Sequence, residues 1–217
     1  MTIFLCFLRI TGSPILQRHW SCLLNDLSMC FTNDMVHHVE IFFPRYDEMY
    51  SSCIDGIGVE KRNISYYNKF NEEASWDLIE LTLSEREEQK IYQFCIDDIK
   101  LYGEKDRYDL KCLISFGLFT DIDKMKYTCT SYVFKALNSS NRLKREINRH
   151  VSEKQWMRIE KHYNPDIMYN IICECIRNKS KYFKRYKTSP VYYRTANRTN
   201  RVISSNSFFI APNDKFR

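Results

Sequence analysis

One cysteine in the sequence lies where a thiol can become reactive. In the segment YTCTSYVFKAL, Thr128 has a residue type that caps the amino end of a helix, which predicts Cys129 as the first helical residue. The helix dipole and the free backbone amides at such a position stabilise a thiolate and lower its pKa. The same amides can hold the oxyanion of a tetrahedral intermediate. Cys129 is therefore a candidate nucleophile, although cysteines near helix starts are commonly small core residues.

A thiol nucleophile also needs a base, usually a histidine. The segment HVEIFF alternates, so His38 and Glu40 share one face of a predicted strand at 38–43. Further strands are predicted at 49–54, 59–62 and 76–82, and the apolar opening TIFLCFLRI also favours a strand. The pattern predicts an antiparallel sheet of at least three strands.

Helices follow the predicted sheet. Ser84 and Glu87 form a capping-box pattern that opens an apolar stripe at helical spacing, and Gly103 ends this segment. Further helices are predicted at 109–119, from Thr128 onward and at 165–176.

The composition is that of one globular domain. The chain has 217 residues and is 44% hydrophobic. Its nine cysteines are irregularly spaced and no secretory signal is evident, so we expect free thiols in a reducing, cytoplasmic compartment. No Cys-x-x-Cys occurs and Cys173-x-Cys175 has poor spacing for zinc, so no metal or cofactor is expected. No apolar run approaches the ~20 residues of a transmembrane helix.

The carboxyl-terminal part of the chain is strongly basic. Residues 177–217 hold eleven Lys or Arg and one acid, whereas the whole chain has a net charge of +6. Tyrosines and phenylalanines are interleaved with these cations, a pattern that can bind nucleic acid or an anionic membrane surface. A solvated, poorly ordered extension is the alternative. The expected organisation is a domain at 1–176 and a basic tail at 177–217.

The order of these segments resembles the circularly permuted NlpC-like papain-fold enzymes, which include YiiX-type bacterial proteins and a poxvirus member. In that group a strand with the histidine comes first and the helix with the cysteine comes last. The matching segments are His38-Val39-Glu40-Ile41, Gly103 with Tyr108-Asp109, and Tyr127-Thr128-Cys129-Thr130. The resemblance spans about residues 35 to 140. It implies an α+β, papain-like fold with an antiparallel sheet packed against helices.

Carried over residue by residue, the resemblance makes Cys129 the nucleophile and His38 the base, with His37 as a rival that faces away from His38's side. A third residue must orient the imidazole. Glu40 shares the face of His38, but two residues along a strand is an awkward distance from which to orient the same ring. The family usually places this residue on the second strand, where Ser52 is preferred over Ser51 and Asp55 follows.

The resemblance implies a cysteine hydrolase that cleaves amide, ester or thioester bonds in peptide or lipid substrates through an acyl-enzyme. A thiol acyltransferase and a catalytically inactive, virion-associated binding module are the alternatives. In the second case the tail at 177–217 is the working part and binds a polyanion or membrane surface. The poxvirus resemblance also allows a location in the virion or host cytoplasm.

Overall fold

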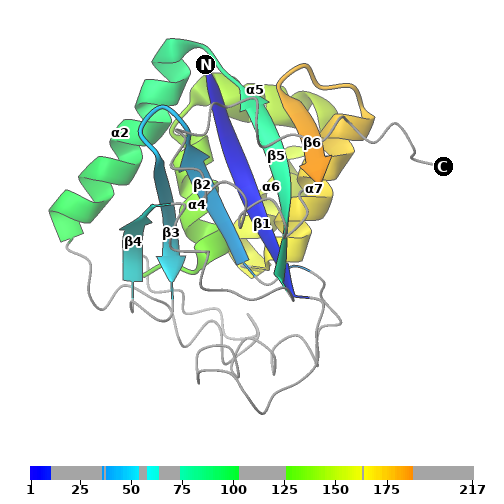
Figure 1. The fold of residues 1–217 in the computed structure, drawn as a ribbon. Helices are drawn as coiled ribbons and strands as arrows, with labels where there is room; N and C mark the ends of the chain where they lie inside the picture. The colour runs from blue at the N-terminus through cyan, green and yellow to red at the C-terminus, as the bar shows by residue number, and fades with distance from the viewer. Residues whose placement is uncertain are drawn as a thin grey trace, which may run out of the picture.

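The computed structural model describes residues 1–10, 36, 38–53, 58–63, 74–102, 126–162 and 164–187. This part of the chain is an α+β structure with a six-stranded antiparallel sheet and five helices (Figure 1). The strands are β1 (Thr2–Ile10), β2 (His38–Phe43), β3 (Glu48–Cys53), β4 (Gly58–Arg62), β5 (Ala74–Thr82) and β6 (Phe183–Lys187). The helices are α2 (Glu85–Tyr102), α4 (Cys129–Asn138), α5 (Asn141–His150), α6 (Glu153–His162) and α7 (Pro165–Arg177).

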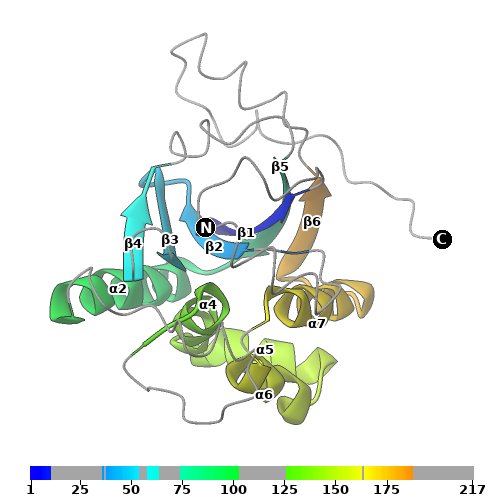
Figure 2. The same ribbon diagram turned by 90° about the horizontal axis from the view of Figure 1, so that it is seen from below.

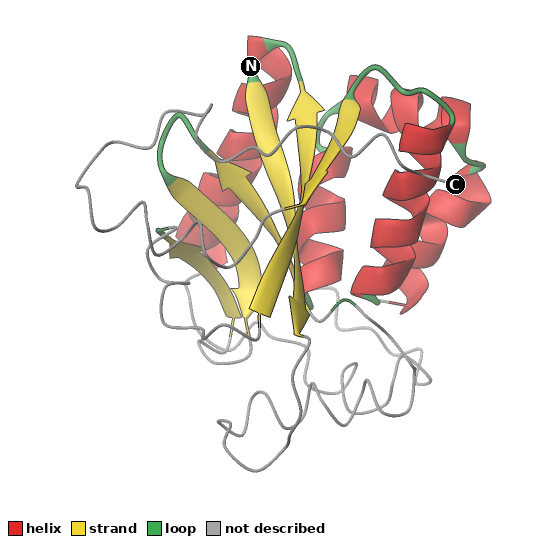
Figure 3. Ribbon diagram, turned by 45° about the vertical axis from the view of Figure 1, so that its right-hand side comes forward, coloured by secondary structure: helices red, strands yellow, loops and turns green. Residues whose placement is uncertain are grey.

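The sheet has the strand order β4-β3-β2-β1-β5-β6, and every neighbouring pair is antiparallel. All five described helices lie on one face of it, so the domain has two layers (Figure 2). Figure 3 shows the same arrangement with the strands in front of the helices. The antiparallel sheet packed against helices is confirmed.

Residues 3–8 of the central strand β1 are buried because this stretch is apolar on both sides. Ile3, Leu5 and Phe7 belong to the main core between the sheet and the helices, and none of them is exposed. The alternate residues are also buried although they point to the opposite face. A strand that is apolar on both faces is suited to the interior of a sheet, where β1 lies between β2 and β5.

The helix starts follow the capping residues in the sequence. Ser84 precedes α2, and its backbone N–H and hydroxyl both donate to the Glu87 carboxylate at 3.0 and 2.6 Å. Asn164 caps α7 by accepting from the Asp166 N–H at 2.7 Å, with Pro165 at the first helical position. The predicted helix at 109–119 lies outside the described residues.

The domain does not end at residue 176, which corrects the expected boundary. β6 pairs with β5 in register, Leu81 opposite Phe183, and Phe183 is buried. The Arg185 guanidinium lies 2.9 Å from the Asp77 carboxylate, which also accepts from the Tyr169 hydroxyl at 2.7 Å. The first part of the basic segment is therefore an edge strand, and the rest of it, 188–217, lies outside the described residues.

Candidate active site

Cys129 is the first residue of α4, as the sequence predicts. Thr128 has an extended backbone, and its hydroxyl accepts from the Ser131 N–H at 3.2 Å. The Ser131 hydroxyl in turn accepts from the Thr128 N–H at 2.9 Å, which completes a capping box. This cap fixes the start of α4, so the Cys129 thiol sits at the positive end of the helix dipole.

His38 is the first residue of β2, and its ring contacts a carboxylate on the same strand. His38 Nε2 is 2.9 Å from Glu40 Oε1, and the exposed fractions of the two side chains are 17% and 1%. Residues two apart on a strand share a face, and here that spacing brings the two groups into contact. The expectation that Glu40 is awkwardly placed to orient the His38 ring is therefore wrong.

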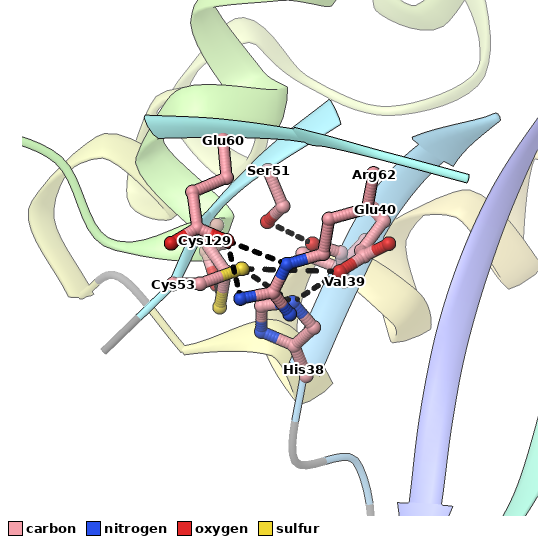
Figure 4. Close-up of polar contacts among 9 residues, drawn as sticks. His38, Val39, Glu40, Ser51, Cys53, Glu60, Arg62 and Cys129 are labelled. Carbon is pink, nitrogen blue, oxygen red and sulfur yellow. Dashed lines mark hydrogen bonds and ion pairs between the residues drawn. The ribbon is translucent and has the colours of Figure 1, made fainter. Parts of the chain in front are cut away.

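The structure brings Cys129 and His38 together from different layers (Figure 4). The two groups lie close enough for each to shift the pKa of the other, and the backbone of Val39 also acts on the Cys129 thiol. The Thr130 hydroxyl lies 3.8 Å from the same sulfur. The thiol thus meets the histidine where the end of the sheet faces the start of α4.

These surroundings shift the two pKa values in opposite directions. Burial by itself would raise the pKa of Cys129, but the charge and hydrogen bond of His38, with those from Val39 and Thr130, bring it below its ordinary value. Burial would lower the pKa of His38, but the adjacent Cys129 and Cys53 sulfurs raise it well above its ordinary value. Both shifts favour a thiolate–imidazolium pair.

Sequence reasoning missed a second cysteine at the histidine. Cys53 Sγ lies 3.7 Å from His38 Nε2 and 3.9 Å from Glu40 Oε1. The β2–β3 register pairs Ile41 with Tyr50, and continuing it places Cys53 opposite His38. The pairing of the two predicted strands could therefore have revealed this cysteine. Burial raises the pKa of Cys53 to about 11, so it is a thiol at neutral pH and no rival to Cys129 as nucleophile.

The two serines of β3 contact backbone carbonyls. Ser52, the preferred orienting residue on this strand, donates to the Tyr127 carbonyl at 3.0 Å, and Ser51 donates to the Val39 carbonyl at 2.8 Å. The Ser52 bond ties β3 to the segment that leads into Cys129. Neither serine therefore orients the imidazole, whose carboxylate partner is Glu40. His37 and Asp55, and the Tyr108-Asp109 and Gly103 matches, lie outside the described residues.

An ion pair on β4 completes this side of the site. Arg62 Nε donates to the Glu60 carboxylate at 2.6 Å, and the two side chains are 10% and 23% exposed. Its positive charge also acts on Cys53, where it opposes the effect of burial on the pKa of that thiol. A cation thus acts on Cys53, the thiol next to His38 (Figure 4).

The contact between Glu40 and His38 predicts a test of the orienting role. Because a carboxylate beside an imidazole favours the imidazolium, Glu40→Gln should raise the apparent pKa at which Cys129 reacts with iodoacetamide and slow the reaction at neutral pH. Glu146→Gln, which alters the His150–Glu146 pair on α5, is the matched control. Identical pH profiles for Glu40→Gln and the unaltered protein would exclude Glu40 from this role.

Comparison with known proteins adds no identification. No family model, curated protein or solved structure matches the chain significantly. Among the helices in the described part of the chain, none is both long and apolar enough to cross a membrane.

Proposed function

We propose that this protein is a cysteine hydrolase of circularly permuted, papain-like (NlpC-like) fold that cleaves amide, ester or thioester bonds. One observation carries the proposal: a cysteine at the start of a helix lies beside a histidine, each shifting the pKa of the other, and the histidine ring also contacts a carboxylate. Nucleophile, base and orienting group in this order form the constellation of a thiol hydrolase. The strand that bears the histidine precedes the helix that bears the cysteine, which is the order of the permuted group.

The geometry supports the following reaction. Glu40 lies 2.9 Å from Nε2 of His38, so we assign the proton exchange with Cys129 to the other ring nitrogen, Nδ1. The Cys129 thiolate attacks the carbonyl carbon, and the imidazolium gives its proton to the departing amine, alcohol or thiol. His38 then removes a proton from water, which attacks the acyl-enzyme and releases the acid and the free thiolate.

The first turn of α4 supplies the electrostatic part of this mechanism. The early backbone N–H groups of a helix lack intrahelical acceptors and point along the axis toward its start. A tetrahedral oxyanion formed on the Cys129 sulfur would lie beside these donors. The same amides explain why a thiolate at this position is stabilised before any substrate binds.

The test is the rate at which iodoacetamide labels each cysteine of the folded protein as a function of pH. We expect selective labelling of Cys129 with an apparent pKa below the ~8.5 of an ordinary thiol. His38→Ala should remove this selectivity. The measurement is made with a chelator present and read by peptide mapping.

A second histidine in the same chain provides the control. His150 contacts Glu146 at 3.1 Å and, like His38, is 17% exposed. His150→Ala removes a histidine–glutamate pair of the same kind, so it should leave labelling of Cys129 unchanged. Slow labelling of all cysteines without regard to His38 would refute the hydrolase proposal.

A further inference from the structure

Three different metal-ligating atoms converge on the face of the sheet opposite the helices. His38 Nε2, Glu40 Oε1 and Cys53 Sγ all lie within 4.8 Å of one another. The separations are 2.9 Å between nitrogen and oxygen, 3.7 Å between sulfur and nitrogen, and 3.9 Å between sulfur and oxygen. A histidine–carboxylate hydrogen bond accounts for the first distance, and the cross-strand pairing of Cys53 with His38 brings a sulfur close to both atoms.

These separations fit a tetrahedral zinc ion. Bond lengths of about 2.0 Å to nitrogen and oxygen and about 2.3 Å to sulfur place the N and O atoms about 3.3 Å apart, with S about 3.5 Å from each. Each measured separation agrees with its tetrahedral value within about 0.4 Å. A ligand set of one nitrogen, one oxygen and one sulfur favours zinc over magnesium or calcium, which prefer oxygen alone.

The surroundings of the three atoms also suit a bound ion, because the positive charge of the neighbouring Arg62 is paired with Glu60. Glu40 and Cys53 are buried, at 1% and 3% exposed, and both sit on paired strands that hold them in place. The His38 side chain is 17% exposed, which leaves a way in for an ion and a position for water. Three protein ligands with an open fourth position are the arrangement of a non-structural zinc site.

We propose that His38, Glu40 and Cys53 form a binding site for a zinc-like divalent cation. The sequence spacing rules for zinc do not find this site because its ligands come from two strands paired across the sheet. A bound ion should inhibit the proposed hydrolase, and this consequence rests on that proposed function. With Nε2 bound to metal, Nδ1 of the His38 ring carries the proton and has no lone pair for the Cys129 thiol, so the ring can no longer act as its base.

Cobalt(II) titration of the full chain under a non-coordinating reductant tests the binding itself. A tetrahedral site with one thiolate should give intense visible bands and one thiolate-to-cobalt charge-transfer band, both lost on addition of zinc. Cys53→Ser should abolish the charge-transfer band. Glu40→Gln should weaken binding at least about tenfold, the scale on which even outer partners of a metal act.

Two further variants separate this site from other thiols. Cys173 is a half-buried cysteine on α7, so Cys173→Ser should keep the full spectrum. Cys129→Ser should also keep it, because the three ligands do not include the nucleophile. Absence of the bands in the unaltered protein, or their loss in Cys129→Ser but not in Cys53→Ser, would overturn the proposal.

A second readout distinguishes this proposal from the hydrolase proposal. Zinc should slow iodoacetamide labelling of Cys129 in the unaltered protein but not in Cys53→Ser. If Cys129 shows no selective reactivity in the presence of a chelator, the hydrolase proposal fails while the cobalt spectrum still decides the metal site. If the cobalt bands are absent and Cys129 remains selectively reactive, only the metal proposal fails.

Discussion

Cys129→Ser should reduce turnover of an activated ester such as p-nitrophenyl acetate by roughly 10³-fold or more, because loss of the nucleophile removes the covalent route. Serine is close to cysteine in size and keeps the start of α4, but its hydroxyl is not ionised by the charge of His38. The unaltered protein should also show an acetyl group on Cys129 by mass spectrometry. This adduct should be absent from the variant.

Cys173→Ser is the matched control for this experiment, since it makes the same substitution on α7, away from His38. It should hydrolyse the ester at the rate of the unaltered protein. An equal rate in Cys129→Ser would show that the ester is cleaved elsewhere on the protein and would contradict the assignment of Cys129 as nucleophile. Circular dichroism of both variants confirms that neither result comes from unfolding.

Phe183→Ala should lower the free energy of unfolding by about 3–5 kcal/mol, because the side chain is 2% exposed and its loss leaves a cavity under the sheet edge. The neighbouring Lys184 is exposed, so Lys184→Ala should change stability by no more than about 0.5 kcal/mol. Urea unfolding measures both values. Equal stabilities for the two variants would place residue 183 outside the folded domain and contradict β6.

Most of the sheet could be predicted because its strands have local sequence patterns typical of strands. Alternation in HVEIFF gives β2 with both ends correct, and the expected strand at 49–54 differs from β3 by one residue at each end. β6 could not be recognised in this way, since its lysines and arginine resemble a solvated tail. β6 is stabilised by its partner strand β5, which is distant in sequence. Arg185, for example, pairs with Asp77, 108 residues earlier.

The helices between α4 and α7 were not predicted, for a related reason. α5 has a narrow apolar face, with Leu143 and Ile147 buried beside Glu146, whose carboxylate is paired with Arg149 and His150. α6 buries Trp156, whose indole N–H donates to the side chain of Asn138 at 3.0 Å. Such short polar helices are stabilised by the core they cover more than by their own sequence.

A site residue could be predicted where a single neighbouring residue fixes its position in the structure. Contacts between residues of two different elements were harder to predict. Thr128 fixes the start of α4, so Cys129 could be placed from the sequence alone. Its partnership with His38 came from resemblance, and the structure brings the two together. The resemblance favours Ser52 as the orienting residue, but its side chain donates to the Tyr127 carbonyl. Cys53 lies on the opposite face of β3 from Ser52, and its contact with His38 could be predicted only from the register of β2 and β3.

The bond from Ser52 to Tyr127 joins residues 75 positions apart, and the Tyr127 hydroxyl also donates to Asp98 on α2 at 2.9 Å. The nucleophile is therefore positioned by contacts of high sequence separation, which are costly in loop-closure entropy and characteristic of slow folding. A chain emerging during synthesis has its histidine strand long before α4 exists. The reactive thiol consequently appears only when the sheet and α4 have docked, and chains that have not finished folding carry no active centre.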